Sequence, residues 1–200
     1  KDICKAIGFP LIEIEGVEAD DVIATITRMA KDAQFKCVVS SLDKDLMQLV
    51  EDPDTTLMNT MKNEIFDEAK VFEKFGVKPN QIRDMLALVG DTSDNIPGVP
   101  KVGQKTAAKW LIEYGDLDGI KENAEAIKGV VGDNLRNSLN ELDRNVELVS
   151  LKEDVDLGFS FDDLLKFNPN DDELDKLFAE LEFAAANKDK QEAPKKDAKY

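Results

Sequence analysis

The order of patterns in the first 41 residues constrains the fold of this chain most strongly. Residues 10–14 (PLIEI) alternate between apolar and polar side chains, which is typical of a short strand. Residues 17–33 repeat apolar side chains at helical spacing, and residues 35–41 (FKCVVSS) form the continuous run of a strand buried on both faces. A strand–helix–strand order predicts a right-handed βαβ unit and a parallel sheet.

The rest of the chain is mostly helical in pattern. We expect a short helix at 43–50, a hairpin from 55–60 and 63–66, and a helix that Asp67 caps and Gly76 ends. Further helices are predicted at 79–89, 104–114, 120–127, 134–149 and 171–183, with a strand-like stretch at 155–159. The prediction is an α/β protein: a partial α/β core at 1–75, a helical region at 76–183, and a polar disordered linker at 184–200.

Composition excludes several classes of function. The net charge of −16 argues against a nucleic-acid partner unless a local basic patch or bound cations reverse the sign. Histidine is absent, so carboxylates are the plentiful catalytic side chains. Cys4 and Cys37 have no metal-binding or disulfide spacing, which favours a reducing cytoplasm. No apolar run is long enough to predict a membrane partner.

Three groups of acidic residues stand out from the charged background. They are Glu18, Asp20 and Asp21; Asp43 and Asp45; and Asp91 and Asp94. The first two groups follow predicted strands, and the carboxyl ends of parallel strands meet at one edge of a sheet. Carboxylates gathered there need cations, and hard oxygen ligands select Mg²⁺ or Mn²⁺. Each group taken alone is more often only a helix-capping signal.

Prolines and glycines between 97 and 103 forbid a continuous helix and predict a tight connector between two helices. Free amides at a helix N-terminus attract anions, and glycine lets a backbone approach closely. Lys101, Lys105 and Lys109 follow at i, i+4 and i+8. A lysine stripe alone is usually a solvated face, but with the connector it favours binding to DNA phosphates, independent of sequence. Trp110 has apolar neighbours and is predicted to lie in the core.

Four segments together resemble a known family. They are GVEADDVIAT, SSLDKDLMQLV, LMNTMKNEIF and LALVGDTSDNIPGVPKVGQKTA, in order over roughly residues 1–150. In this they resemble the 5′-nuclease family, which includes flap endonucleases and the N-terminal 5′→3′ exonuclease domain of bacterial DNA polymerase I. The fold that this implies is a PIN- or Rossmann-like parallel-sheet core followed by a helix–hairpin–helix subdomain.

The resemblance also implies roles for individual residues. The catalytic and metal-binding residues for two Mg²⁺ (or Mn²⁺) would be Glu18, Asp20, Asp21, Asp43, Asp45, Asp91 and Asp94. The connector would be the duplex-binding helix–hairpin–helix, which in relatives also holds K⁺. Its DNA-binding residues would be Gly98, Val99, Lys101, Val102, Gly103, Lys105, Thr106 and Lys109.

The implied activity is a 5′→3′ exonuclease and 5′-flap endonuclease in primer removal and repair. Its partners would be duplex DNA with a 5′ flap or nick and a polymerase domain of the same polypeptide, in the bacterial cytoplasm.

Two departures from the family pattern leave alternatives open. Lys101 stands where many relatives have glycine, and a non-glycine residue there must avoid positive φ or adopt it at a cost. The chain begins without Met and lacks the family's first strand with its metal-binding Asp, the next catalytic Asp and the basic arch, so we expect a piece of a longer protein. The alternatives are a non-catalytic duplex-DNA-binding module and an acidic scaffold without DNA affinity.

Overall fold

The computed structural model describes residues 1–181, which belong to two compact units. Within the described residues, the smaller unit joins Lys1–Glu13 to residues 162–181. In it, α1 (Asp2–Ile7) packs against α9 (Asp171–Glu180), and the Phe9 and Phe167 rings meet edge-to-face with centroids 5.7 Å apart. Helix α8 (Phe161–Leu164) lies at the division between the units. The larger unit, Ile14–Phe161, contains all seven predicted carboxylates.

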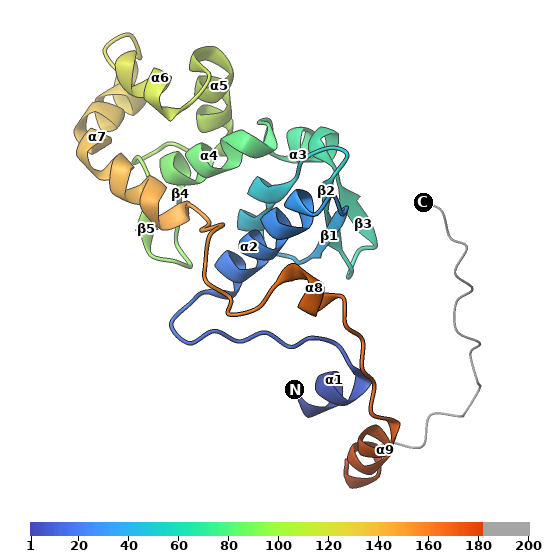
Figure 1. Ribbon diagram of the computed structural model, residues 1–200. Helices are drawn as coiled ribbons and strands as arrows, with labels where there is room; N and C mark the ends of the chain where they lie inside the picture. Colours follow the sequence, from blue (N-terminus) through green and yellow to red (C-terminus); the bar gives the residue numbers. More distant parts are fainter. Residues whose placement is uncertain (182–200) are drawn as a thin grey trace. The chain divides into compact units, whose positions relative to one another are not determined.

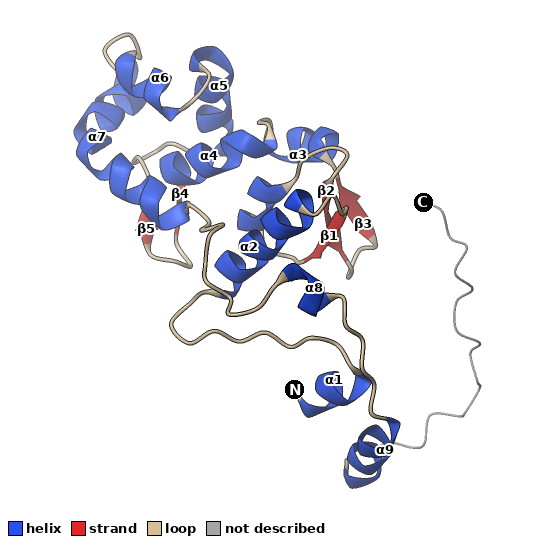
Figure 2. Ribbon diagram, in the orientation of Figure 1, coloured by secondary structure: helices blue, strands red, loops and turns tan. Residues whose placement is uncertain are grey.

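A three-stranded sheet lies in the larger unit in the order β1 (Cys37–Ser40), β2 (Thr55–Asn59), β3 (Glu64–Phe66). The pair β1–β2 is parallel, and β2–β3 is antiparallel (Figure 2). The 3₁₀ helix η1 (Asp45–Leu49) lies in the connection from β1 to β2. The predicted hairpin at 55–66 is therefore confirmed, and the parallel pairing belongs to β1 and β2.

The predicted strand at 10–14 is wrong, because these residues have no strand conformation. The βαβ unit expected around residues 17–33 therefore does not form. A strand needs a hydrogen-bonded neighbour, and no strand in residues 1–181 pairs with this segment. The strand-like stretch at 155–159 is likewise irregular. Strand β1 is not buried on both faces: Val38 is 60% exposed while Val39 faces the core, so the run alternates.

Two helices flank the sheet in sequence. Helix α2 (Ala19–Asp32) contacts β1 and η1, and α3 (Glu68–Phe75) follows β3 (Figure 1). The ends of α3 are as predicted: the Asp67 carboxylate accepts the Lys70 amide at 2.8 Å, and Gly76 ends the helix with φ of 76°.

The following helical part surrounds α4 (Ile82–Val89), which packs against α7 (Gly129–Val149), α5 (Gln104–Tyr114) and η1 (Figure 1). The 3₁₀ helix η2 (Pro79–Gln81) precedes α4, and a small hairpin of β4 (Gly90–Asp91) and β5 (Ile96–Pro97) follows it. The predicted bounds of α5 are confirmed. Helix α6 (Leu117–Glu122) begins earlier than predicted, because Asp116 caps it through the Gly119 amide at 2.8 Å, and it also ends earlier, at Glu122.

One hydrophobic core runs through the larger unit. It extends from Val39 to Val149, and it includes the almost fully buried Leu46, Leu111 and Leu142. Apolar side chains from both sides of residue 75 share this core. The domain boundary after residue 75 stays a prediction, and the predicted linker at 184–200 lies outside the described residues.

Candidate metal centre and nucleic-acid interface

The turn after β1 positions the second acidic group. The Ser41 hydroxyl accepts the Asp43 amide at 3.0 Å, and the Asp43 carboxylate accepts the Asp45 amide at 3.0 Å. These two side-chain-to-backbone bonds bend the chain into η1, which starts at Asp45. Asp43 therefore lies close to the helix start, as predicted, and both carboxylates follow the end of β1.

The β4–β5 hairpin positions the third acidic group. The backbone directly after β5 lies so close to the end of α4 that a Cβ built on Gly98 would lie 2.1 Å from the Val89 carbonyl oxygen. Gly90 also has φ of 78°, which favours glycine. The tight crossing places Asp91 in β4 and Asp94 in the turn between the two strands.

The two acidic groups meet in space. One carboxylate oxygen each from Asp45, Asp91 and Asp94 lies within 4.8 Å of the other two. In addition, Asp45 Oδ1 is buried and has no hydrogen-bond partner within residues 1–181. A buried, unpartnered carboxylate oxygen is costly unless a cation or proton satisfies it. The three side chains thus fit a hard divalent cation.

The carboxylates differ in their electrostatic environment. Burial, followed by the charge of Asp43, raises the pKa of Asp45 to about 6. Asp91 shows the opposite effect: its bonds to Lys44 and then Ser93 lower its pKa to about 2. Lys44 Nζ lies 2.6 Å from Asp91 Oδ2, and this carboxylate raises the pKa of Lys44. At neutral pH Asp91 is therefore fully ionised, whereas Asp45 takes up a proton when the pH falls to about 6.

The first acidic group, at the start of α2, is divided between two environments. Burial, then the charges of Asp43 and Glu18, raise the pKa of Asp20, and Asp94 contributes further. Asp20 therefore belongs electrostatically with the cluster, while Glu18 is exposed at the N-cap. The Asp21 carboxylate instead accepts the backbone amide of Lys152 at 2.9 Å. This bond ties α2 to the segment after α7, and the other oxygen of Asp21 lies 3.9 Å from Lys152 Nζ.

The connector at 98–103 is anchored from within the fold. The Val99 amide donates to the Leu88 carbonyl at 2.8 Å, and the Val102 amide donates to the Val99 carbonyl at 3.0 Å. Both valine side chains are buried, so their predicted contacts with DNA could involve only the backbone. Lys101 has φ of 67°, as the third residue of a type II turn requires, so it adopts the strained conformation.

The first turn of α5 presents the predicted basic face. In the described chain, the amides of Gln104 and Lys105 have no hydrogen-bond acceptor, and Gly103 caps the helix without a side-chain bond. Lys105 and Lys109 are exposed, and Trp110 is buried as predicted. Lys105, Thr106 and Lys109 line a cavity of about 420 Å³, and Lys128 joins them from the N-cap of α7.

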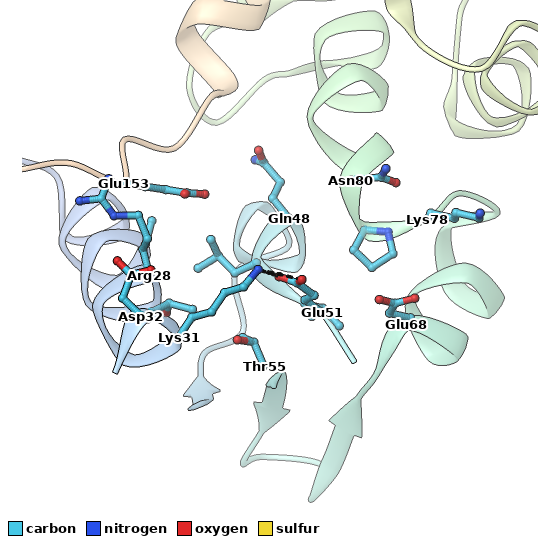
Figure 3. A pocket seen from close by; sticks show the side chains of 15 residues that line it. Arg28, Lys31, Asp32, Gln48, Glu51, Thr55, Glu68, Lys78, Asn80 and Glu153 are labelled. Atoms are coloured by element: carbon cyan, nitrogen blue, oxygen red, sulfur yellow. Dashed lines mark hydrogen bonds and ion pairs between the residues drawn. The ribbon is translucent and has the colours of Figure 1, made fainter. Parts of the chain in front are cut away.

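A second cavity, of about 580 Å³, lies among α2, η1, β2 and α3 (Figure 3). Its lining mixes cationic and anionic side chains, and Lys31 contacts both Glu51 oxygens, at 2.6 and 2.8 Å. None of the seven predicted carboxylates lines this cavity. It is therefore separate from the acidic cluster.

Sequence reasoning missed the residues that hold the cluster from outside it. The buried Asn145 amide donates to the Pro97 carbonyl at 2.5 Å and to the Ala87 carbonyl at 3.2 Å, which ties the hairpin to α7. Lys44 also contacts the cluster across the fold, and Ser93 holds Asp91 from two residues along the chain. The signals available in the sequence were that Lys44 lies between Asp43 and Asp45 and that Ser93 lies between Asp91 and Asp94.

Comparison with known proteins decides which family this site belongs to. Residues 1–76 match the family model described as the 5′-3′ exonuclease N-terminal resolvase-like domain, and residues 77–173 match the 5′-3′ exonuclease C-terminal SAM fold. The chain belongs to the 5′-3′ exonuclease family. The predicted resemblance and fold class are confirmed, and the members of this family are hydrolytic nucleases.

Individual 5′-3′ exonuclease relatives align over nearly all of the chain. DNA polymerase I of Mycobacterium bovis is 43% identical over 188 residues, which cover 92% of this chain and 21% of the relative. The 5′-3′ exonuclease of Aquifex aeolicus is 39% identical over 189 residues, with 94% and 64% covered. The chain thus spans about a fifth of the length of the first and under two thirds of the second.

A solved structure places DNA and metal ions on a related exonuclease fold. A substituted form of the bacteriophage T5 D15 flap endonuclease, in a pseudo-enzyme–product complex with DNA and metal ions, matches with a TM-score of 0.69 and 28% identity. The match covers 76% of this chain and 56% of that one.

In residues 1–181 of our chain, no helix combines the length and the apolar character that crossing a membrane requires.

Proposed function

We propose that this chain is part of a divalent-metal-dependent nuclease that hydrolyses DNA phosphodiester bonds as a 5′→3′ exonuclease and 5′-flap endonuclease. The observation that carries the proposal is the meeting of Asp45, Asp91 and Asp94 oxygens within 4.8 Å, with one Asp45 oxygen buried and unpartnered in the described chain. Membership of the 5′-3′ exonuclease family supports the reaction type. The metal ions in the complex of the T5 relative support the cofactor class.

In this proposal the carboxylates hold two Mg²⁺ or Mn²⁺ ions. Asp45, Asp91 and Asp94 are the ligands that the geometry favours, and Asp20 and Asp43 complete the cluster. Glu18 and Asp21 keep the metal-binding role that the resemblance implies. Bound ions of this kind activate water and stabilise the charge of a phosphodiester displacement. The chain's own contribution is to hold the carboxylates at a fixed spacing through the Asp43–Asp45 turn and the β4–β5 hairpin.

The DNA contact proposed for the connector and α5 complements this site. Free amides at the start of α5 and the exposed side chains of Lys101, Lys105 and Lys109 would bind phosphates. These groups read no base edges, so the affinity should depend on salt and little on sequence. The two charge signs thus serve one substrate: carboxylates reach the DNA through cations, and the lysines reach it directly.

The wider biological setting is proposed from the relatives. Similarity to DNA polymerase I supports a polymerase domain in the same polypeptide, and with it primer removal in replication and repair in a bacterial cytoplasm. Duplex DNA with a 5′ flap or nick is the proposed substrate, and K⁺ at the connector is a further proposed ligand.

The test is cleavage by the full-length protein of a duplex with a labelled 5′ flap. We expect product with Mg²⁺, none with EDTA, and a large loss of rate in Asp45→Asn and Asp91→Asn. Asp118→Asn is the matched control, because Asp118 is an exposed aspartate on α6 that pairs with Lys121. Salt-sensitive duplex binding that survives EDTA, without product, would instead support the non-catalytic binding module.

A further inference from the structure

Lys44 occupies an unusual position within the acidic cluster. Its ammonium lies 2.6 Å from Asp91 Oδ2, and the Ser93 amide and hydroxyl donate to Asp91 Oδ1 at 2.8 and 2.5 Å. Both oxygens of the buried Asp91 are therefore engaged. Asp45 differs, because one of its oxygens has no partner in the described chain.

The two Ser93 donors occupy Asp91 Oδ1, so a metal that uses Asp91 would bind Oδ2, directly beside the Lys44 ammonium. The Ser93 contacts lie inside the hairpin turn, and one of them comes from the backbone, so they are fixed by the hairpin. The Lys44 side chain is 45% exposed and ends a flexible four-carbon stem. Release of Lys44 is therefore the smaller structural change.

We infer that Lys44 is a resident counter-ion of the carboxylate cluster, which a divalent cation displaces from Asp91 when it binds. An Mg²⁺ or Mn²⁺ ion sits about 2.1 Å from its oxygen ligands, so ion and ammonium would otherwise share one carboxylate oxygen at close range. Displacement removes this repulsion. The inference rests on the proposed function for the existence of the metal site, but the role of Lys44 is separate from it.

Two consequences follow for the chain's properties. The metal-free protein is stabilised by the Lys44–Asp91 pair, which offsets the mutual repulsion of the acidic residues around it. Metal affinity is correspondingly weaker than the carboxylates alone would give, because each binding event must break that pair.

The experiment is calorimetric titration of Mn²⁺ alone into the 200-residue protein and its Lys44→Met and Lys44→Arg variants. We expect Lys44→Met to bind Mn²⁺ roughly fivefold more tightly, and Lys44→Arg to stay within about twofold of wild type because it keeps the cation. Lys31→Met is the matched control: it removes the same charge and side chain from a pair with Glu51 in the separate cavity of Figure 3. Its affinity should match wild type.

A second readout follows Lys44 directly. In protein with ¹⁵N-labelled lysine, the hydrogen-bonded Lys44 ammonium gives an NMR signal that is identified by its absence from Lys44→Arg. We expect this signal in EDTA and its loss at saturating Mg²⁺, and melting of metal-free Lys44→Met below the wild-type temperature.

The outcomes separate the two proposals. Equal or weaker Mn²⁺ binding by Lys44→Met, or a Lys44 signal that persists at saturating Mg²⁺, would overturn the displacement and leave the metal site standing. Tighter binding in Lys31→Met as well would reduce the effect to net charge and overturn the inference. Absence of Mn²⁺ binding in both wild type and Lys44→Met would overturn the inference and the proposed metal site together.

Discussion

Replacing Asp45 by Asn should make the metal-free protein more stable, although the residue lies at the centre of the candidate site. Burial and the Asp43 charge raise the pKa of Asp45 from 3.8 to about 6. The ionised form is therefore disfavoured in the folded state relative to the unfolded chain, and the full shift would correspond to about 3 kcal/mol. Because Asp45 is only partly buried, solvent screening reduces this, and we expect about 1–2 kcal/mol.

The dependence on pH gives this prediction its sign. The carboxyl is protonated in both states below pH 3.8, so its penalty is absent there. The penalty grows as pH rises from 3.8 and is complete above about 6. The stability gained in Asp45→Asn should therefore be full at about pH 7.5 and roughly half as large at about pH 5.

The assay is urea unfolding in EDTA at both pH values, for wild type, Asp45→Asn and the exposed control Asp118→Asn. Added Mn²⁺ should then stabilise wild type and leave Asp45→Asn nearly unchanged, which separates a site residue from an ordinary stabilising mutation. The reasoning fails if Asp45→Asn is no more stable than wild type at the higher pH in EDTA, or if its advantage is the same at the lower pH.

Three further predictions concern the acidic cluster, the hairpin that carries it and the connector. Asp91→Asn should destabilise the metal-free protein by about 1–3 kcal/mol in urea unfolding, the opposite of Asp45→Asn. The reason is that a carboxylate of lowered pKa loses its charged bonds to Lys44 and Ser93, and unchanged stability would contradict this. Asn145→Ala should lower the free energy of unfolding by about 1–3 kcal/mol in the same assay and weaken Mn²⁺ binding, because the Pro97 and Ala87 carbonyls lose their donor. A stability loss with unchanged Mn²⁺ affinity would show that the hairpin keeps its position without Asn145. Lys101→Gly should leave stability unchanged or raise it by up to about 1 kcal/mol, because glycine adopts a positive φ without strain. Its affinity for duplex DNA should fall in fluorescence-anisotropy titrations, and the slope of log affinity against log salt concentration should shrink by about one. An unchanged slope would place Lys101 away from the phosphates.

Features set by neighbouring residues could be predicted from the sequence. Asp67 and Gly76 mark the ends of α3, and the bounds of α5 follow from glycines at 103 and 115. Each of these signals acts within one or two helical turns. The hairpin of β2 and β3 is similarly local.

Features that need distant partners were not predictable in this way. The segment 10–14 has the alternation of a strand, but alternation supplies no pairing partner. The pairing of Lys44 with Asp91 and the Asn145 bonds to the hairpin join positions about 50 residues apart in the chain. The sequence argument for bringing Asp20 near Asp43 relied on a strand at 10–14 that is absent. In the fold the charge of Asp43 nevertheless helps to raise the pKa of Asp20, while the role of Asp20 as a metal ligand stays a prediction.

The continuous core has a practical consequence for dissecting this protein. A cut between residues 76 and 77 would leave each fragment with one half of a shared apolar surface, and it would separate Asp45 from Asp91 and Asp94. Neither fragment alone would then carry a complete cation site. Mixing the two should restore both features at once, which makes this chain suited to fragment complementation, with metal binding as the signal of reassembly.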